Sequence, residues 1–244
     1  MILYGRNPVA EALRGRRAKS VGEVWATAGA AREPFLQGVE VRLASSEEIE
    51  RRCGSSAHQG VCADAGSYPY SGAQEILAAS DPLIVALDQV QDPQNLGSIC
   101  RTAECAGAAG VVIPERRAAE VTPAVCKASA GAVEHLPLAR VRNMADFLAA
   151  ARAAGCWCYG ASAEATAGQR APVSYDSPDY AGAGVVLVLG SEGAGLRPRV
   201  AKACDELIAL PLRGRIESLG VSAAAAAILY EILQSRERGL DNAS

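Results

Sequence analysis

Three glycines within six residues mark a loop that could hold a ligand, Gly190-Ser191-Glu192-Gly193-Ala194-Gly195. The loop follows the apolar run 185–189, whose β-branched residues predict a strand buried on both faces of a parallel sheet. Glycines let backbone N–H groups approach a ligand closely, and ligands of open α/β sheets bind at the carboxyl ends of strands. The loop therefore predicts a binding site, although Glu192 by itself could be a solvated turn residue.

A second chemical stretch follows the predicted strand 83–87 and contains Asn95, Gly97 and Arg101. Gly97 would let a substrate or another backbone approach the first turn of the helix expected over 92–105. Asn95, taken alone, is interpreted as a helix-start residue. The neighbours of Arg101 are apolar: Leu96, Ile99, Cys100 and Ala103. We therefore interpret Arg101 as an arginine in apolar surroundings that needs a partner, and not as an exposed charge.

Metal and hydrolase chemistry find little support in the sequence. The chain has two histidines, His58 and His135, which lie far apart. Its eight cysteines include no C-x-x-C pair, and without a secretory signal they do not indicate disulfides. Cys156 and Cys158 would share one face of a strand as small buried hydrophobes. We expect neither a zinc site nor a Ser-His-Asp set, so the chemistry must use other groups.

From residue 83 onward, predicted strands alternate with predicted helices. The expected strands are 83–87, 110–113, 156–159, 185–189 and 206–212, and the expected helices are 92–105, 123–130, 143–154 and 221–234. Alternation of this kind indicates an α/β fold with a largely parallel sheet and right-handed crossovers. Two strand ends and the start of an alanine-rich helix would thus bring their loops together at one site.

Residues 1–68 predict a separate small α+β unit, and residues 69–82, with two prolines and a glycine, predict a linker. The unit should contain a helix over 8–14, strands over 21–27 and 39–43, a helix capped near Ser45, and a turn at 58–60 that leads into a strand. Its basic residues gather at Arg14, Arg16, Arg17 and Lys19. Alone, this cluster is interpreted as a solvated loop, and the alternative is a surface that contacts phosphates.

The overall composition restricts the class of protein. A net charge of −3 over 244 residues argues against a uniformly basic nucleic-acid coat, but not against a local basic patch. No apolar stretch approaches the ~20 residues that span a bilayer, and the first residues lack the apolar core of a signal peptide. These observations predict a soluble cytoplasmic protein without a membrane partner.

Taken in order, the stretches resemble a known family. Asn95-x-Gly97-x-x-x-Arg101, Gly190-x-Glu192-x-x-Gly195-Leu196, and residues 208–212 together with Glu217-Ser218-Leu219-x-Val221-Ser222 resemble the three motifs of the SpoU (TrmH-type) branch of the SPOUT RNA methyltransferases. Residues 4–13, 58–61 and 127–135 are similar to the RlmB-type subgroup, which methylates guanosine 2′-hydroxyls of 23S ribosomal RNA. The resemblance covers the whole chain.

The resemblance implies a SPOUT methyltransferase domain over 83–244, with a deep trefoil knot, and an L30e-like RNA substrate-binding domain over 1–68. It also implies S-adenosylmethionine as cofactor, ribosomal RNA as partner, and a homodimer with each site near the subunit interface. The residues implied for cofactor binding are Gly190, Leu210, Leu219 and Ala161. Those implied for catalysis are Asn95, Arg101, Glu192 and Ser218, and those for RNA binding are Arg6, Arg14, Arg16, Arg17 and Lys19.

Methyl transfer to a ribose hydroxyl is an in-line displacement in which the hydroxyl loses its proton. The resemblance assigns Arg101 as proton acceptor, although a guanidinium normally stays protonated. In the other interpretation Arg101 grips a phosphate and stabilises the developing alkoxide, while water or Glu192 takes the proton. The sequence does not decide between these two roles of Arg101.

The chain departs from the family pattern at Gly220, where the family usually has an asparagine. A water or another side chain must replace that amide, or the protein is a noncatalytic RNA-binding or assembly factor. We expect retained activity because the four implied catalytic residues are present. A dinucleotide-binding oxidoreductase is a further alternative, but the spacing of Gly190, Gly193 and Gly195 does not match its phosphate loop.

Overall fold

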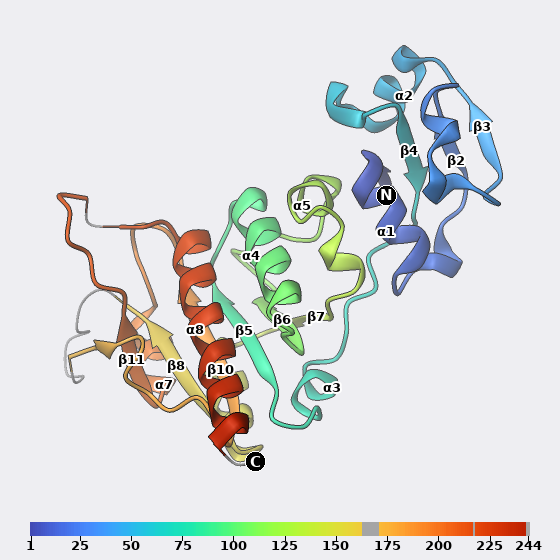
Figure 1. Cartoon of the computed structure of the whole chain (residues 1–244). Helices are drawn as coiled ribbons and strands as arrows, with labels where there is room; N and C mark the ends of the chain where they lie inside the picture. The colour runs from blue at the N-terminus through green and yellow to red at the C-terminus, as the bar shows by residue number, and fades with distance from the viewer. Residues whose placement is uncertain (163–170, 217, 243–244) are drawn as a thin grey trace.

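The computed structural model describes residues 1–162, 171–216 and 218–242, which form two units, each built on its own sheet (Figure 1). The smaller unit contains the N-terminus, and the larger one contains the seven-stranded sheet and the C-terminal helix. Glu217, which opens the third motif, lies outside the described residues. The deep trefoil knot stays a prediction.

The first sheet has four strands in the order β1-β4-β2-β3. The elements of this unit are β1 Ile2–Tyr4, α1 Arg6–Arg14, β2 Val24–Ala26, β3 Val41–Leu43, α2 Ser46–Cys53 and β4 Val61–Asp64. Ser45 and Glu48 form a capping box at the start of α2, as Ser45 predicts. The sequence did not indicate β1, because three residues are too few for an alternating pattern, and its hydrogen bonds come from the distant strand β4.

The second sheet has seven strands in the order β7-β6-β5-β10-β8-β11-β9, and all its pairs are parallel. The strands are β5 Leu83–Asp88, β6 Gly110–Pro114, β7 Leu138–Val141, β8 Cys156–Ala161, β9 Val173–Ser174, β10 Gly184–Gly190 and β11 Glu206–Ala209. The predicted α/β fold with a parallel sheet is confirmed. The edge strands β7 and β9 were missed because neither carries a long apolar run.

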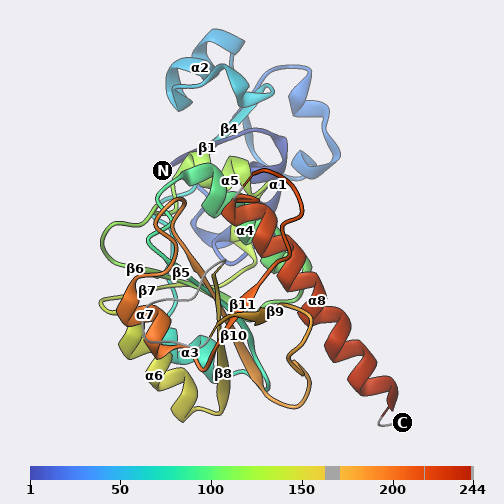
Figure 2. The same ribbon diagram turned by 90° about the vertical axis from the view of Figure 1, so that its left-hand side faces the viewer.

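Helices cover both faces of this sheet (Figure 2). They are α3 Ala73–Leu77, α4 Pro93–Cys105, α5 Pro123–Ala128, α6 Met144–Ala153, α7 Pro198–Ala203 and α8 Val221–Asn242. Alternate residues of β5 face opposite layers: Val85 joins the core under α4, α5 and α8, whereas Ala86 joins the core under α3, α6 and α7. Burial of both faces explains why β5 and β10 are unbroken apolar runs.

Several boundaries differ from the sequence predictions. The segment 69–82 is more than a linker, since it contains α3, which buries Ile76 and Leu77 against the sheet. The prolines and glycine of that segment concealed a helix of five residues. Strand β11 ends at Ala209 and not at residue 212, because the chain leaves the sheet there. Helix α8 reaches Asn242, well beyond the expected end at 234.

A buried ion pair between Arg17 and Glu134 joins the two units. The two residues are 2% and 1% exposed, and the guanidinium donates to the carboxylate through Nε at 2.7 Å and Nη2 at 2.5 Å. Burial lowers the pKa of Arg17, but the hydrogen bond and charge of Glu134 outweigh it and leave that pKa above its ordinary value. The prediction that Arg17 contacts RNA is therefore wrong, because its charge is enclosed and already paired.

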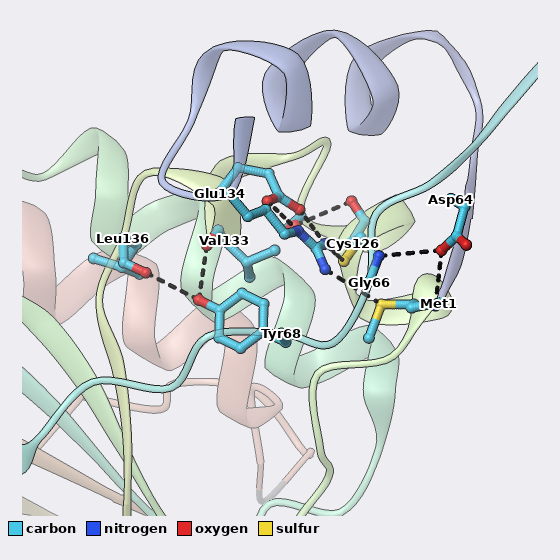
Figure 3. A network of polar contacts seen from close by, with 10 residues as sticks. Met1, Asp64, Gly66, Tyr68, Cys126, Val133, Glu134 and Leu136 are labelled. Carbon is cyan, nitrogen blue, oxygen red and sulfur yellow. Dashed lines mark hydrogen bonds and ion pairs between the residues drawn. The ribbon is translucent and has the colours of Figure 1, made fainter. Parts of the chain in front are cut away.

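Further contacts surround this pair (Figure 3). The hydroxyl of Tyr68 donates to the backbone oxygens of Val133 and Leu136, at 2.8 and 3.2 Å. At the rim, Lys127 Nζ donates to Gln59 Oε1 at 3.0 Å. The two units therefore meet through an ordered polar core and not through an open connection.

Cys156 and Cys158 are both buried on one face of β8, while Trp157 between them is exposed. Their interpretation as small core residues is confirmed. Within the described ranges, no helix is long and apolar enough to cross a membrane.

Candidate functional site

A cavity of about 480 Å³ lies where the chain leaves β8, β10 and β11 and enters α8. Its walls include the four residues predicted for cofactor binding, Ala161, Gly190, Leu210 and Leu219. The buried side chains of Leu189, Ile208 and Ile228 also line it. These segments are distant in sequence, but parallel strands bring their carboxyl ends to the same edge of the sheet. The predicted site thus forms around one cavity.

The loop between β10 and α7 closes on itself. Ser191 N donates to Gly195 O at 3.1 Å, and Gly195 N donates to Ser191 O at 2.9 Å. A Cβ on Gly190 would collide with the backbone of Gly195, and Gly195 has a φ of +64°. The glycines are therefore needed for the shape of the loop itself, in addition to any close approach of a ligand.

A buried carboxylate fixes the far end of this loop. Asp88, the last residue of β5, is fully buried and accepts hydrogen bonds from Arg197 N at 2.9 Å and Arg197 Nε at 2.8 Å. Neither residue of this pair has a role predicted from the sequence. An acidic residue at the end of an apolar strand indicates that the carboxylate fixes a nearby loop. No residue close to Asp88 in sequence identifies Arg197 as its partner.

Asn95 connects the first and second motifs. Its amide Nδ2 donates to Glu192 Oε1 at 2.6 Å and to Asp92 Oδ2 at 3.2 Å, while Asp92 caps α4 by accepting from Gln94 N. Because both partners are carboxylates, which only accept hydrogen bonds, the NH2 group of Asn95 must face them. The amide oxygen of Asn95 is thereby left available as an acceptor.

A second cavity, of about 260 Å³, adjoins the first. Its lining residues are Gln89, Val90, Gln91, Asp92, Asn95, Ser191 and Glu192. Ser191 and Glu192 line both cavities, so they form a shared wall.

Ser218 and Gly220 lie just before the start of α8, and both line the larger cavity. Gly220 N donates to Ser218 Oγ at 3.1 Å. Gly220 has a φ of +83°, and a Cβ there would meet nothing within 4 Å. The space for a side chain is therefore present even though glycine supplies none.

Comparison with known proteins agrees with this geometry. The model of the SpoU rRNA Methylase family matches residues 82–230, and that of the RNA 2′-O ribose methyltransferase substrate binding family matches residues 2–71. The chain belongs to the SpoU rRNA methylase family. A SpoU relative, the 23S rRNA (guanosine-2′-O-)-methyltransferase RlmB of Pseudomonas syringae pv. tomato, is 36% identical over 248 residues, which cover 96% of this chain and 95% of the relative.

Two solved structures are also similar. The AdoMet-bound rRNA methyltransferase from Sinorhizobium meliloti has a TM-score of 0.78 and 29% identity, and the match covers 96% of this chain and 86% of that chain. The SpoU methyltransferase AviRb from Streptomyces viridochromogenes, in complex with AdoMet, has a TM-score of 0.76 and 25% identity over 96% of this chain and 89% of that chain.

The SpoU motif residue Arg101 lies apart from the other three predicted catalytic residues. It is exposed on α4 and lines neither cavity. The inference that Arg101 sits in apolar surroundings is wrong, because its apolar neighbours in sequence, such as Ile99 and Cys100, are buried on the other side of α4. In the described part of the chain its guanidinium has no ion-pair partner.

The remaining residues predicted to bind RNA lie on the surface of the small unit or at its edge. Arg6 pairs with Glu33 at 2.7 Å, Arg14 with Glu11 at 3.4 Å, and Arg16 Nη2 donates to Ser71 Oγ at 2.6 Å. Lys19 is exposed. Unlike Arg17, these side chains are open to solvent, so a phosphate could reach them.

Two exposed apolar side chains line the larger cavity, Leu212 and Leu219, which is 52% exposed. Ile216, close to them in sequence, is 76% exposed, and Tyr230 on α8 is also exposed. Large apolar side chains that gather on a surface mark an interaction site.

Proposed function

We propose that this protein transfers a methyl group from S-adenosylmethionine to a ribose 2′-hydroxyl of ribosomal RNA, at a guanosine. The observation that carries the proposal is the hydrogen bond between Asn95 and Glu192, at 2.6 Å, beside a cavity of about 480 Å³. The bond brings the polar groups of two SpoU motifs to the wall of a space suited to a small cofactor. A ribosome-directed enzyme of this kind would work in the cytoplasm.

The residues around the larger cavity fit S-adenosylmethionine. Its volume of about 480 Å³ falls within the usual range of small-molecule sites. Leu189, Ile208 and Ile228 provide apolar contact for a base, and the loops at Gly190 and Leu210 expose backbone groups that can bind polar edges. When bound, S-adenosylmethionine supplies a methyl group activated by a sulfonium charge.

Glu192 accepts the proton of the attacking hydroxyl, and Asn95 orients the carboxylate of Glu192. A 2′-hydroxyl that received the methyl group would have to lose its proton. A carboxylate accepts a proton more readily than a guanidinium. Glu192 uses Oε1 for Asn95, and its other oxygen has no partner among the described residues. The free oxygen of Glu192 takes the proton, and the hydrogen bond from Asn95 Nδ2 to the other oxygen holds the carboxylate in position.

Arg101 contributes by binding RNA. An exposed guanidinium without an ion-pair partner in the described ranges is suited to a backbone phosphate, which it can bind through two parallel hydrogen bonds. Held near the reacting ribose, its charge would stabilise the developing alkoxide. Ser218, which lines the larger cavity, can donate its hydroxyl hydrogen to the same oxygen.

Residues 1–68 serve as the RNA substrate-binding domain and residues 83–244 as the methyltransferase domain. The exposed residues Arg6, Arg14, Arg16 and Lys19 would contact phosphates, which is the usual source of affinity for nucleic acid. The exposed apolar residues Leu212 and Leu219, which line the cavity, support a homodimer, because a second copy of the chain would cover them.

A noncatalytic RNA-binding role is the second candidate, and Gly220 favours it. The position lines the cavity, yet it lacks the amide that the family usually carries there. Such a protein would bind S-adenosylmethionine and RNA without transferring the methyl group.

The decisive experiment incubates the purified protein with radiolabelled S-adenosylmethionine and 23S ribosomal RNA, and maps the modified nucleotide. A methylated guanosine ribose is expected. Cofactor binding measured by calorimetry without incorporation of label would instead establish the noncatalytic role. Label on a base and not on a ribose would refute the proposed chemistry.

A further inference from the structure

We propose that the second cavity binds the base of the target nucleotide, and that Gln89 reads it as guanine. This inference rests on the proposed function, since it names the part of the same site that selects the nucleotide. The cavity measures about 260 Å³ and is open to solvent at Gln91 and Asp92.

The position of the cavity suits the base of a nucleotide under attack. Ser191 and Glu192 separate it from the larger cavity. A base in the second cavity places its ribose at this shared wall, beside the carboxylate of Glu192 and the amide of Asn95. The hydroxyl then faces the cavity in which the methyl donor is proposed to bind. Enzymes that act on one nucleotide commonly hold its base in such a pocket.

The segment that forms the floor of this cavity is held in an unusual conformation. Gln89 has a φ of +66°, a left-handed conformation that residues other than glycine rarely adopt. The next residue, Val90, is buried, and its carbonyl accepts a hydrogen bond from Ala119 N at 2.9 Å. Asp92 then caps α4. The residues that follow the strained Gln89 are thus fixed, as expected where a side chain must be aimed at a ligand.

The chemistry of the lining favours guanine. Among the lining residues in the described part of the chain there is neither Lys nor Arg, so a phosphate would not be held there. The lining offers two carboxylates, from Asp92 and Glu192, and the amides of Gln89 and Gln91. Within the described ranges neither glutamine side chain forms a hydrogen bond. Both oxygens of Asp92 already accept hydrogen bonds, from Gln94 N and from Asn95 Nδ2. Among the described residues, the acceptors of the lining that still lack donors are therefore the amide oxygens of the two glutamines and one oxygen of Glu192.

Guanine matches this acceptor-rich lining better than the other bases do. Its Watson–Crick edge carries two neighbouring donors, N1–H and the 2-amino group, beside the acceptor O6. Adenine and cytosine each carry one donor group on that edge, and uracil carries one donor between two acceptors. The amide oxygen of a glutamine can accept from the 2-amino group, the donor that inosine lacks, while a second acceptor of the lining takes N1–H. We assign this contact to Gln89 because its backbone is the one that is strained.

The test compares binding of guanosine, inosine and adenosine 5′-monophosphates by ligand-observed NMR competition, with S-adenosylhomocysteine present. Inosine lacks only the 2-amino group of guanosine. The variants are Gln89→Gly, which removes the amide and relieves the backbone, and Gln89→Asn, which keeps an amide and tolerates the left-handed conformation. Gln94→Ala is the control, because Gln94 is exposed on α4 and does not line the cavity.

Wild type should bind guanosine monophosphate about tenfold more tightly than inosine monophosphate, the value of one hydrogen bond. Gln89→Gly should reduce that preference to less than twofold, while Gln89→Asn and Gln94→Ala retain most of it. Equal binding of the two nucleotides by wild type, or an unchanged preference in Gln89→Gly, overturns the assignment.

Methyl transfer to ribosomal RNA, measured on the same variants, separates this inference from the proposed function. A guanosine preference that depends on Gln89, in a protein that methylates no RNA, supports the base pocket and refutes the enzyme. Equal methylation of guanosine and inosine at the target position of an RNA hairpin supports the enzyme and refutes the base pocket.

Discussion

The cofactor cavity and the junction between the two units are built in opposite ways. The cavity is made of loops, in which the glycines Gly190 and Gly195 shape the backbone and few side chains are paired. The junction is made of side chains, with the ion pair between Arg17 and Glu134 enclosed at its centre. A loop depends on the residue types within a short segment, whereas the ion pair depends on two residues 117 positions apart. The first construction leaves a pattern in the sequence and the second does not.

The difference predicts that the two regions fail differently when they are mutated. Changes at the cavity should abolish chemistry in a folded protein, because its polar groups lie at the surface. Changes at the junction should unfold the protein or loosen its units, because they leave a charge buried without a partner.

The largest effect is expected for Glu192→Gln. Glutamine preserves an oxygen for Asn95 but cannot accept the proton, so turnover should fall by ~10²–10⁴. Affinity for S-adenosylmethionine should stay within about twofold, because the substitution leaves the apolar lining of the cavity unchanged. Single-turnover kinetics and calorimetry measure the two quantities, and Glu104→Gln on the exposed face of α4 is the control. Near-normal turnover would assign the proton to water and leave Glu192 with the task of orienting Asn95.

The next effect, on stability, is expected for Glu134→Ala. Removal of the carboxylate leaves the Arg17 guanidinium buried without its partner, which costs about 3–5 kcal/mol. Urea denaturation followed by circular dichroism measures the free energy of unfolding. The double variant Arg17→Met with Glu134→Leu should recover most of the loss, since an apolar pair of similar volume removes the buried charge.

The exposed pair of Arg42 and Glu23, at 2.6 Å, is the matched control. Arg42→Ala should cost less than about 1 kcal/mol, because water screens exposed charges. If Glu134→Ala were no more costly than this control, the junction would not depend on its buried pair and the contrast with the cavity would disappear.

The fate of individual residues shows which features the sequence could predict. Ala161, Gly190, Leu210 and Leu219 line one cavity as expected, because their motifs lie at strand ends that a parallel sheet gathers at one edge. The family resemblance indicated which strand ends to choose. The conformation of the glycine loop also follows from its own residues.

Predictions about individual charges were less successful, for a physical reason. Arg17 was grouped with its exposed neighbours, although only the distant Glu134 decides that it is buried. Arg101 was placed in apolar surroundings, although α4 separates it from Ile99 and Cys100 by the rotation of the helix. The pairing of Asp88 with Arg197 was missed. The environment of a charge is a property of the tertiary structure, and the residues next to it in sequence do not reveal it.

Arg101→Ala tests whether the exposed arginine belongs functionally to the cavity that it does not line. Turnover should fall by ~10²–10³, the usual loss of one donor that stabilises an oxyanion. The free energy of unfolding should change by less than about 0.5 kcal/mol, because the side chain is exposed. Arg101→Lys should keep part of the activity if the positive charge alone stabilises the alkoxide. It should keep none if the planar guanidinium with its two parallel hydrogen bonds is required. Normal turnover in Arg101→Ala would remove Arg101 from the catalytic set.

The smallest effect is expected at the rim of the junction, at Asp64. A hydrogen bond from Gly66 N, at 3.1 Å, and then the N-terminal ammonium, at 3.3 Å, lower the pKa of Asp64 below the ordinary value of 3.8. Because the pKa is lowered in the folded state, the charged carboxylate stabilises the fold at any pH above the ordinary pKa. This contribution is lost as the pH falls through the lowered pKa. Because Asp64 is half exposed, screening keeps the contribution small.

Wild type should therefore have a slightly higher melting temperature than Asp64→Asn at pH 7, and the difference should shrink as the pH falls through the lowered pKa of Asp64. Glu134→Ala should remain destabilised across the same range, because Arg17 stays charged at every pH in it. A scan of melting temperature against pH compares the two variants directly. If the melting temperatures of wild type and Asp64→Asn still differed at a pH where Asp64 is protonated, the side chain would act through packing and not through its charge. The distinction between the exposed rim and the buried centre of the junction would then be lost.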